Sequence, residues 1–404
     1  MQNLLIAPFI ILPFLINTDF SDPTLIVRRT SLFIILFSIL SIFHLNKIKI
    51  NNISKTQTIW VLMFISYLLF SLISSYFVSQ NFIESLWGLM YMLGWLCVSI
   101  TFFLYAQKIN MSNILVATSY VGGIISFLSI LQAFNFLNIE NLSPTSGSFF
   151  NRNFWGMYLC FLIPASAYSI IKFDDLRNKT IHTLLFTFSF CSLIHCRARA
   201  AWLAIFSGFI LLLIIHHKSI FNYFSNIDKS KTYFKTLWII PLLVGLFVII
   251  EPDVENVPTY KKSVWSTLTS STKDNVIDKK NISTIGERAQ LYKTTLDMIK
   301  DHTLFGIGYN NWRIINLKYF GEYIHDDNYL KLNQRPHNDL LWITSETGIF
   351  GLLIFMFIIL VPLSFAFKKI VLAKKNKDHL LESFLMISVI IILIESLFDF
   401  PKQR

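Results

Sequence analysis

A short polar stretch near the C-terminal end carries side chains suited to acid–base chemistry. Residues 335–355 read RPHNDLLWITSETGIFGLLIF, so Arg335, His337, Asn338 and Asp339 stand at the head of a long apolar run. Histidine exchanges protons readily near neutral pH, which makes His337 a candidate general base. A histidine at a membrane edge is more often a plain interfacial residue. The assignment therefore rests on its polar and charged neighbours.

Two arginines mark the short segment between two earlier apolar runs. Arg197 and Arg199 lie in HCRARAAWLAIFSG, residues 195–208, and are separated by one residue. Two guanidinium groups this close repel each other, and both are costly at the rim of a hydrocarbon layer. A doubly charged partner such as a pyrophosphate would relieve that cost, because the guanidinium fork binds phosphate oxygens in pairs.

A further arginine, Arg288, falls in TIGERAQLYKTTLDMIKDH, residues 284–302. Thr284 and Glu287 have capping-box spacing, which predicts the start of an amphipathic helix. The apolar face of this helix is predicted from Ala289, Tyr292, Leu296 and Ile299. Arg288 would then lie in the first turn, where unpaired N–H groups and the helix dipole favour an anion. The alternative is a solvated surface arginine.

Asparagines begin another apolar run, in GSFFNRNFWGMYL, residues 147–159. Asn151 and Asn153 flank Arg152 there. Asparagine caps helices and also binds sugar hydroxyls, so both roles stay open for these residues, as they do for Asn338.

A glycine-rich turn follows the 284–302 helix in the sequence FGIGYNNW. Gly306 and Gly308 are predicted to end the helix, and Tyr309 in this turn is a further candidate for orienting a substrate. The Gly-x-Gly pattern does not indicate nucleotide binding, because it lacks the lysine of a phosphate-binding loop.

The composition identifies a membrane protein. Of 404 residues, 54% are hydrophobic and only 15% are charged, far outside the range of soluble domains. We predict an all-α, polytopic integral membrane protein with about 11 (10–12) transmembrane helices and one large loop that contains amphipathic helices. The N-terminal run lacks a basic segment and a cleavage site, so we expect it to be retained. The predicted spans are 4–20, 28–45, 58–79, 82–106, 113–137, 154–171, 180–196, 199–216, 235–250, 338–367 and 383–400.

Basic residues are distributed unequally between the two sides of this bundle. With a cytoplasmic N-terminus, sixteen lysines and arginines lie in inner short loops and five in outer ones, as the positive-inside rule requires. Fifteen of the sixteen are lysine, whereas every outer one is arginine. Membrane topology requires only positive charge, which lysine also supplies. The arginines therefore indicate a polyanion site at the outer face, and the alternative is that five interfacial residues are arginine by chance. The outer arginines are Arg28, Arg29, Arg152, Arg197 and Arg199.

Four regions follow from this pattern. They are N-terminal transmembrane helices at 1–146, central helices with the arginine turn at 147–250, a large periplasmic loop at 251–337 and C-terminal helices at 338–404. The four cysteines lie in or beside apolar runs and imply no disulfide or zinc site. The nine histidines include no HxxxH pair, so no metal or cofactor is expected. Topology accounts for the net charge of +11 without a nucleic-acid partner.

Several of these segments together resemble the O-antigen ligase and Wzy-type polymerase superfamily. His337 and Asn338 are followed, after nine residues, by Gly348 and Gly351, an arrangement similar to the signature of that superfamily. The segments RAAWLA at 199–204, GSFFNRNFWGMYL and GERAQLYKTTLDMIKDHTLFGIGYNNW resemble other blocks of the family. The two glycines after His337 are also expected to let a neighbouring helix pack closely.

The resemblance implies a GT-C-like membrane glycosyltransferase of the bacterial inner membrane. Its donor would be a glycan on undecaprenyl pyrophosphate, transferred to an acceptor hydroxyl at the periplasmic face without a metal and with inversion. By matching position, Arg199 and Arg288 would bind the pyrophosphate and His337 would act as the base. Arg197 and Arg335 are added to the pyrophosphate set because they are near in sequence.

Three acceptors and one other class of protein remain open. The favoured reading is an O-antigen ligase of lipopolysaccharide biosynthesis, with lipid A–core as acceptor. A Wzy-type polymerase and a protein O-oligosaccharyltransferase are the alternatives. A transporter or flippase for lipid-linked glycans would need charged residues inside spans. Four glutamates, Glu84, Glu346, Glu382 and Glu395, lie in or near predicted spans.

Overall fold

The fold is all-α, as predicted. The computed structural model describes residues 2–16, 25–45, 53–105, 110–137, 139, 142–149, 151–225, 240, 244, 284–320, 335–372 and 379–399. Within these ranges twelve α-helices and one 3-10 helix are assigned. The helices are α1 (Gln2–Ile11), η1 (Leu12–Phe14), α2 (Leu25–Leu45), α3 (Lys55–Val78), α4 (Phe82–Leu104), α5 (Met111–Ala133), α6 (Arg152–Lys172), α7 (Leu176–Cys196), α8 (Arg199–Ser225), α12 (Thr284–Asp301), α13 (Trp312–Phe320), α14 (Asp339–Leu372) and α15 (Leu380–Ser396).

Five of these helices are long and apolar enough to cross a membrane. They are α3, α4, α5, α6 and the Asp339–Ile370 part of α14, and each coincides with a predicted span. The Arg199–Ile215 part of α8 is apolar but shorter. These helices are what a polytopic membrane protein requires, while the total of eleven spans remains a prediction.

The first predicted span, 4–20, differs from the structure. The chain there forms the ten-residue α1 and then the 3-10 helix η1, which contains Pro13. Ten helical residues rise only about 15 Å, half of the hydrocarbon thickness. Proline lacks an N–H group, so the run of apolar residues does not continue as one α-helix. The predicted span 235–250 lies almost entirely outside the described residues, as do 251–283 and 321–334 of the large loop.

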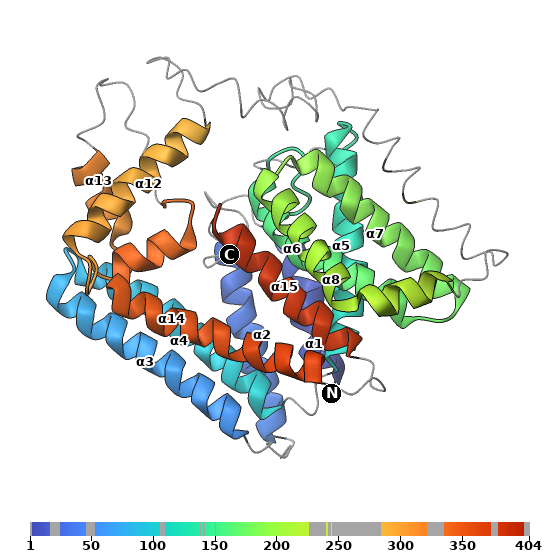
Figure 1. Cartoon of the computed structure of the whole chain (residues 1–404), viewed down its shortest axis with the longest axis horizontal. Helices are drawn as coiled ribbons and strands as arrows, with labels where there is room; N and C mark the ends of the chain where they lie inside the picture. Colours follow the sequence, from blue (N-terminus) through green and yellow to red (C-terminus); the bar gives the residue numbers. More distant parts are fainter. Residues whose placement is uncertain are drawn as a thin grey trace.

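The helices form two groups that meet near the end of α15 (Figure 1). In the first group, α3 packs on α4 and α14, and α12 packs on α13 and α14. In the second, α6 packs on α5, α7, α8 and α15, and its side chains form much of the largest buried cluster. α14 and α15 also contact each other. The helix ends that carry the candidate site residues come from both groups. The N-terminal end of α14 belongs to the first group, and the N-terminal ends of α6 and α8 and the C-terminal end of α15 belong to the second.

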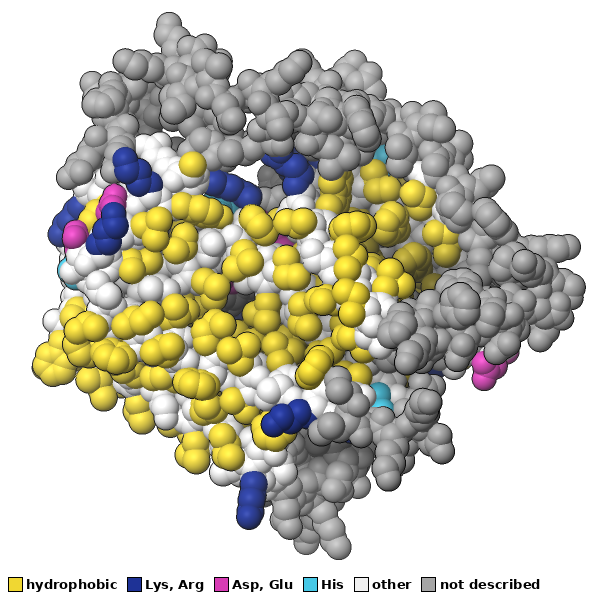
Figure 2. All heavy atoms as spheres, in the orientation of Figure 1, with side chains coloured by type: hydrophobic (Ala, Val, Ile, Leu, Met, Phe, Trp, Pro, Cys, Tyr) yellow, Lys and Arg dark blue, Asp and Glu magenta, His cyan; other side chains and the backbone are white. Residues whose placement is uncertain are grey.

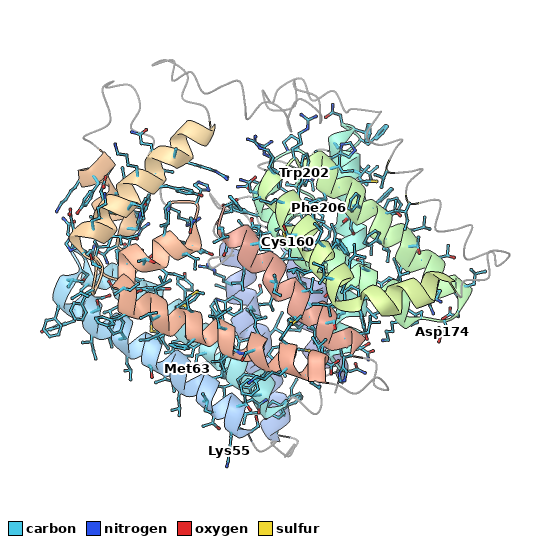
Figure 3. All side chains as sticks on the ribbon, in the orientation of Figure 1. Lys55, Met63, Cys160, Asp174, Trp202 and Phe206 are labelled. Carbon is cyan, nitrogen blue, oxygen red and sulfur yellow. The ribbon has the colours of Figure 1, made fainter. Side chains whose placement is uncertain are left out.

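The surface has the layered character of a membrane protein. Figure 2 shows hydrophobic side chains over the middle of the visible face, with lysines and arginines toward its upper and lower parts. In Figure 3, Lys55 lies at the lower edge and Asp174 at the right-hand edge, whereas Trp202 lies near the upper end of α8. Charged residues at the two rims and apolar ones between them match a bilayer-spanning belt.

The amphipathic helix predicted at 284–302 is present as α12, but its buried face was assigned wrongly. Leu291, Thr294, Thr295 and Met298 are buried, whereas Leu296 is exposed. The hydroxyls of the two threonines donate to the carbonyl oxygen of Leu291, at 2.9 and 2.6 Å. Because these polar groups are satisfied inside the helix, they can be buried, and a pattern based on apolar residues misses that face.

A break in α14 provides the docking point for this helix and the turn after it. Gly348 has φ 66° and ψ −173°, a combination available essentially only to glycine, and it divides α14 in two. Just before the break, the carbonyls of Ser345 and Glu346 accept hydrogen bonds from the N–H groups of Ile307 (2.9 Å) and Gly308 (3.0 Å). Residues 303–308 thus bond to residues 345–349 backbone to backbone; we call this contact the glycine junction.

The glycine junction needs glycine on both sides. A Cβ atom on Gly306 would collide with the backbone of Glu346, and one on Gly348 would collide with the carbonyl of Leu304. Both glycines also have positive φ. The expectation that Gly348 serves close helix–helix packing is therefore corrected: it breaks its own helix and receives a turn.

The same turn is fastened to the α3–α4 connection by a buried amide. The side-chain nitrogen of Asn311 donates to Ser85 Oγ (2.8 Å), and its oxygen accepts from the N–H of Asn81 (2.9 Å). The N–H of Tyr309 donates to Ser75 Oγ at 2.8 Å. The turn is therefore held by α14 on one side and by α3 and α4 on the other.

Substitution of Gly348 by alanine is expected to destabilise the protein strongly. The new methyl group forces both an unfavourable backbone conformation and a clash with backbone atoms, together worth at least about 2 kcal/mol. Thermal unfolding of the purified protein in detergent measures the effect. Leu353→Ala is the control, since Leu353 lies on the same helix with half of its surface exposed. Equal melting temperatures for Gly348→Ala and wild type would contradict the role of the junction.

Candidate active site

His337 and Asp399 form the centre of the candidate active site. His337 Nδ1 lies 3.2 Å from Asp399 Oδ1, and the imidazole is 30% exposed while the carboxylate is only 3% exposed. When Nδ1–H donates to the carboxylate, the Nε2 lone pair of the imidazole is left as the acceptor. A buried carboxylate that orients an accessible imidazole is the arrangement of a general base.

The start of α14 holds His337 in place. Asn338 Oδ1 accepts from the N–H of Leu341 at 3.0 Å and so caps the helix, while its Nδ2 donates to the carbonyl of Leu397 at 2.9 Å. His337 itself adopts a left-handed conformation, with φ 57°. Of the two roles left open for Asn338, the geometry provides the cap, and the same amide joins α14 to the end of α15.

Tyr292 of α12 completes this contact from the loop side. Its hydroxyl lies 2.9 Å from the carbonyl oxygen of His337 and 3.3 Å from that of Leu397, and donates to them. Burial raises the pKa of Tyr292, opposed in part by the positive charge of Arg288, so the phenol keeps its proton at neutral pH. Tyr292 therefore acts as a donor that ties three helices together around the imidazole.

Three arginines gather near the C-terminal end of α15. Arg288 Nη1 donates to the carbonyl of Phe398 at 2.9 Å, which places it next to Asp399 in sequence. Arg199, at the first turn of α8, is close enough to Arg288 and Arg152 to interact with both charges. The predicted arginines Arg199 and Arg288 are therefore brought together, and Arg152 joins them. Three positive charges in one place provide a site for a multiply charged anion.

Carboxylates also lie behind this arginine cluster. Glu395, near the end of α15, is 2% exposed and interacts electrostatically with Asp399, Asp339 and Arg288. These acids come from the end of α15 and the start of α14. Of these acids, Asp399 follows the Phe398 carbonyl that Arg288 contacts, so it partly balances the positive charge of the arginines.

Arg197 occupies a different environment from Arg199. It caps α7 in a left-handed conformation, with φ 52°, and its residue surface is only 4% exposed. The turn between α7 and α8 thus directs Arg197 inward and leaves Arg199 exposed at the start of α8.

Arg335 and Tyr309 lie around a separate pocket. It has a volume of about 340 Å³ and is lined by residues of α2, α4, α13 and α14 and of the 303–311 turn. The Arg335 guanidinium lies 5.9 Å from the centre of the Trp342 ring. Tyr309 is almost fully buried and also packs against Tyr67 and Leu89 of α3 and α4.

Asn151 is used as a helix cap. Its side-chain oxygen accepts from the N–H groups of Asn153 (3.0 Å) and Phe154 (3.1 Å), which starts α6. The cap sets Arg152 at the first position of α6. Asn153 is half-buried one residue further on.

Glu346 receives a structural explanation. Its Oε1 accepts from the N–H of Trp312 at 3.3 Å, so the carboxylate lies at the N-terminal end of α13. Negative charge is favourable there because it meets unpaired N–H groups and the positive end of the helix dipole. Glu346 also lines the pocket that contains Arg335.

Two members of the site were not assigned to it from sequence. Asp399 is separated from His337 by 62 residues. The sequence did hold one signal for this contact. Asp399 lies at the outer end of the last predicted span, and the start of the predicted 338–367 span, next to His337, lies on the same side. Tyr292 was assigned to an apolar face, although a phenol beside Arg288 also carries a hydrogen-bond donor.

A comparison with protein families matches part of the chain to a known family. Residues 184–356 match the O-antigen ligase family, Wzy_C. The match includes Arg197, Arg199, Arg288 and His337 and ends before Asp399. A comparison with curated proteins gives no match. Members of the Wzy_C family are membrane glycosyltransferases of the ligase or polymerase type that act on lipid-linked glycans. The chain therefore carries an O-antigen ligase domain of the Wzy_C family over residues 184–356.

Proposed function

We propose that the protein transfers a glycan from an undecaprenyl-pyrophosphate donor to an acceptor hydroxyl at the periplasmic face of the bacterial inner membrane, as an O-antigen ligase. The observation that carries this proposal is the contact of His337 with Asp399 beside the cluster of Arg288, Arg199 and Arg152. A base and a polycationic cluster side by side are what attack on a sugar pyrophosphate requires. Lipid A–core is the proposed acceptor.

The proposed reaction is a single displacement. The acceptor oxygen attacks the anomeric carbon, and the bond from that carbon to the pyrophosphate oxygen breaks with its electron pair on the leaving group. The proton of the acceptor hydroxyl passes to His337 Nε2, while Asp399 stabilises the imidazolium that forms. Attack opposite the leaving group inverts the anomeric centre.

The arginines stabilise the departing pyrophosphate. Negative charge on the leaving group grows as the bond breaks, and fixed guanidinium groups in a half-buried site oppose that charge with little reorganisation. This supports a transfer that does not depend on a metal ion. Arg288 is held by the Phe398 carbonyl, so it belongs to the same rigid unit as Asp399.

The other candidate residues are proposed either to contact the substrate or to hold the surrounding helices and turns in place. Asn338 and Asn151 are proposed to act through their helix caps, and Asn153 is proposed to face the glycan from the start of α6. Arg197 is assigned to the α7–α8 turn, because its side chain is buried. Arg335 and Tyr309 are assigned to the neighbouring pocket.

His337→Ala is expected to lower kcat by about 10²–10⁴-fold, because the general base is lost. Asp399→Asn is expected to lower kcat by about 10- to 100-fold, with KM for donor and acceptor nearly unchanged, since the imidazole loses its orienting partner. Transfer by purified protein from a lipid-pyrophosphate-linked glycan measures both. Asp297→Asn is the control, because Asp297 lies on α12 and forms an ion pair with the exposed Lys300. Full transfer by His337→Ala would overturn the mechanism.

Arg288→Gln and Arg199→Gln are each expected to lower kcat/KM for the donor by about 10²-fold, since each removes a charged fork from the leaving group. Arg177→Gln provides a control arginine on the opposite rim, in the first turn of α7. If both cluster variants keep the wild-type kcat/KM, the pyrophosphate is bound elsewhere.

The products of the same assay identify the acceptor. Glycan joined to lipid A–core supports the ligase. Glycan joined only to a second lipid-linked repeat unit supports the polymerase, and glycan joined to a serine or threonine of a protein supports the O-oligosaccharyltransferase. Movement of glycan across sealed vesicles without a new bond would instead indicate a transporter.

The proposed orientation can be tested with single cysteines in a background without the four native ones. A membrane-impermeant maleimide added to whole cells with a permeable outer membrane is expected to label position 302, which is exposed at the end of α12, and to spare position 174, which is exposed just before α7. Labelling of position 174 alone would reverse the topology.

A further inference from the structure

The pocket beside the candidate active site is lined by two kinds of residue. We call the aromatic ones, from α4 and the start of α14, the aromatic wall, and Arg29, Arg313 and Arg335 the polar wall. The volume of the pocket, about 340 Å³, lies at the lower end of the range typical of small-molecule sites.

The aromatic wall follows one face of α4. Trp87, Tyr91 and Trp95 are spaced four residues apart, so they lie above one another over a rise of roughly 12 Å. The wall therefore extends from near the outer end of α4 to a depth at which a bilayer is hydrocarbon. Trp87 is 63% exposed, and Tyr91 and Trp95 are each about 40% exposed. α4 is also one of the least buried spanning helices, which leaves this wall open to the lipid.

The polar wall carries fixed positive charge. The Arg29 guanidinium lies 4.6 Å from the centre of the Tyr91 ring, and that of Arg335 lies 5.9 Å from the centre of the Trp342 ring. A guanidinium stacked on a ring has a set orientation and still presents N–H donors at its edges. These two arginines therefore favour a phosphate or another oxyanion in the pocket.

The acids in the pocket are already engaged with other groups. Glu84 pairs with Arg313 at 2.6 Å and also accepts from the Asn310 side chain. Glu346 accepts from the N-terminal N–H of α13. The lining thus contains three arginines and two glutamates, a formal excess of one positive charge.

We propose that this pocket binds the acceptor as a phosphorylated, membrane-anchored glycan, with its phosphate at Arg29 and Arg335 and its lipid-proximal part along Trp87, Tyr91 and Trp95. Aromatic faces suit both sugar rings and the first methylene groups of a lipid chain. Arg335 lies two residues before His337, so an acceptor held here has its glycan next to the proposed base. The inference rests on the proposed function in calling this ligand the acceptor. Binding of the ligand to the pocket does not itself depend on catalysis.

Native mass spectrometry of the purified full-length protein tests this binding directly. The probes are a diphosphorylated lipid A, a polyprenyl pyrophosphate and phosphatidylethanolamine, which has no net charge. We expect selective retention of a phosphorylated glycan lipid, reduced about fivefold or more by Arg29→Gln and by Trp87→Ala, each of which removes one contact group. Trp87 is mostly exposed, so Trp87→Ala is expected to fold. Phe37→Ala on α2 is the control, because Phe37 is 74% exposed and does not line the pocket.

The outcomes distinguish the source of the lipid. A lipid A-type acceptor is supported if lipid A is retained, if the pocket variants weaken that retention and if Arg288→Gln leaves it unchanged. Retention of polyprenyl pyrophosphate with the same pattern supports the pocket with a second polyprenyl-linked glycan as acceptor. Equal retention of all three lipids, or retention that both pocket variants leave unchanged, overturns the proposal. Wild-type protein that binds selectively but forms no glycosidic bond would refute the proposed function and leave the pocket standing.

Discussion

The glycine junction is the contact on which the rest of the site depends. Residues 303–308 and 345–349 meet through backbone hydrogen bonds, with Gly306 and Gly348 at positions that exclude any side chain. This contact adds backbone hydrogen bonds to the side-chain packing between α12 and α14, where Leu291, Met298 and Trp342 share one buried cluster. Since α12 carries Arg288 and Tyr292, and α14 begins beside His337, the junction sets the spacing between the proposed base and the proposed anion site.

Charge balance is the second constraint on this site. Arg199 is close enough to Arg288 and Arg152 to be repelled by both, and it loses hydration where it is buried. Asp399, which follows the Phe398 carbonyl that Arg288 contacts, lowers that repulsion only in part. The three arginines therefore leave a surplus of positive charge. A dianionic ligand would complete the balance, so binding and electrostatic relief are the same event.

The sequence was sufficient for the class of fold and for part of the site. Hydropathy, charge and resemblance predicted the helix at 284–302 and the arginines Arg199 and Arg288. They also predicted that His337 lies on the same side of the bundle as these arginines. Asp399 did not follow, because its contact with His337 joins the ends of two different helices. The buried face of α12 was missed because Thr294 and Thr295 satisfy their hydroxyls within the helix. The break at Gly348 was missed because hydropathy is continuous across it.

The eight residues from Arg335 to Trp342 belong to both the pocket and the acid–base centre. Arg335 and Trp342 line the pocket, while His337 and Asn338 contact the end of α15. A ligand that shifts this segment from one side changes its fit on the other side. Linkage makes such an effect reciprocal, so the two substrates would alter each other's affinity by the same factor. The order in which they bind would then be a property of this one segment rather than of two independent sites.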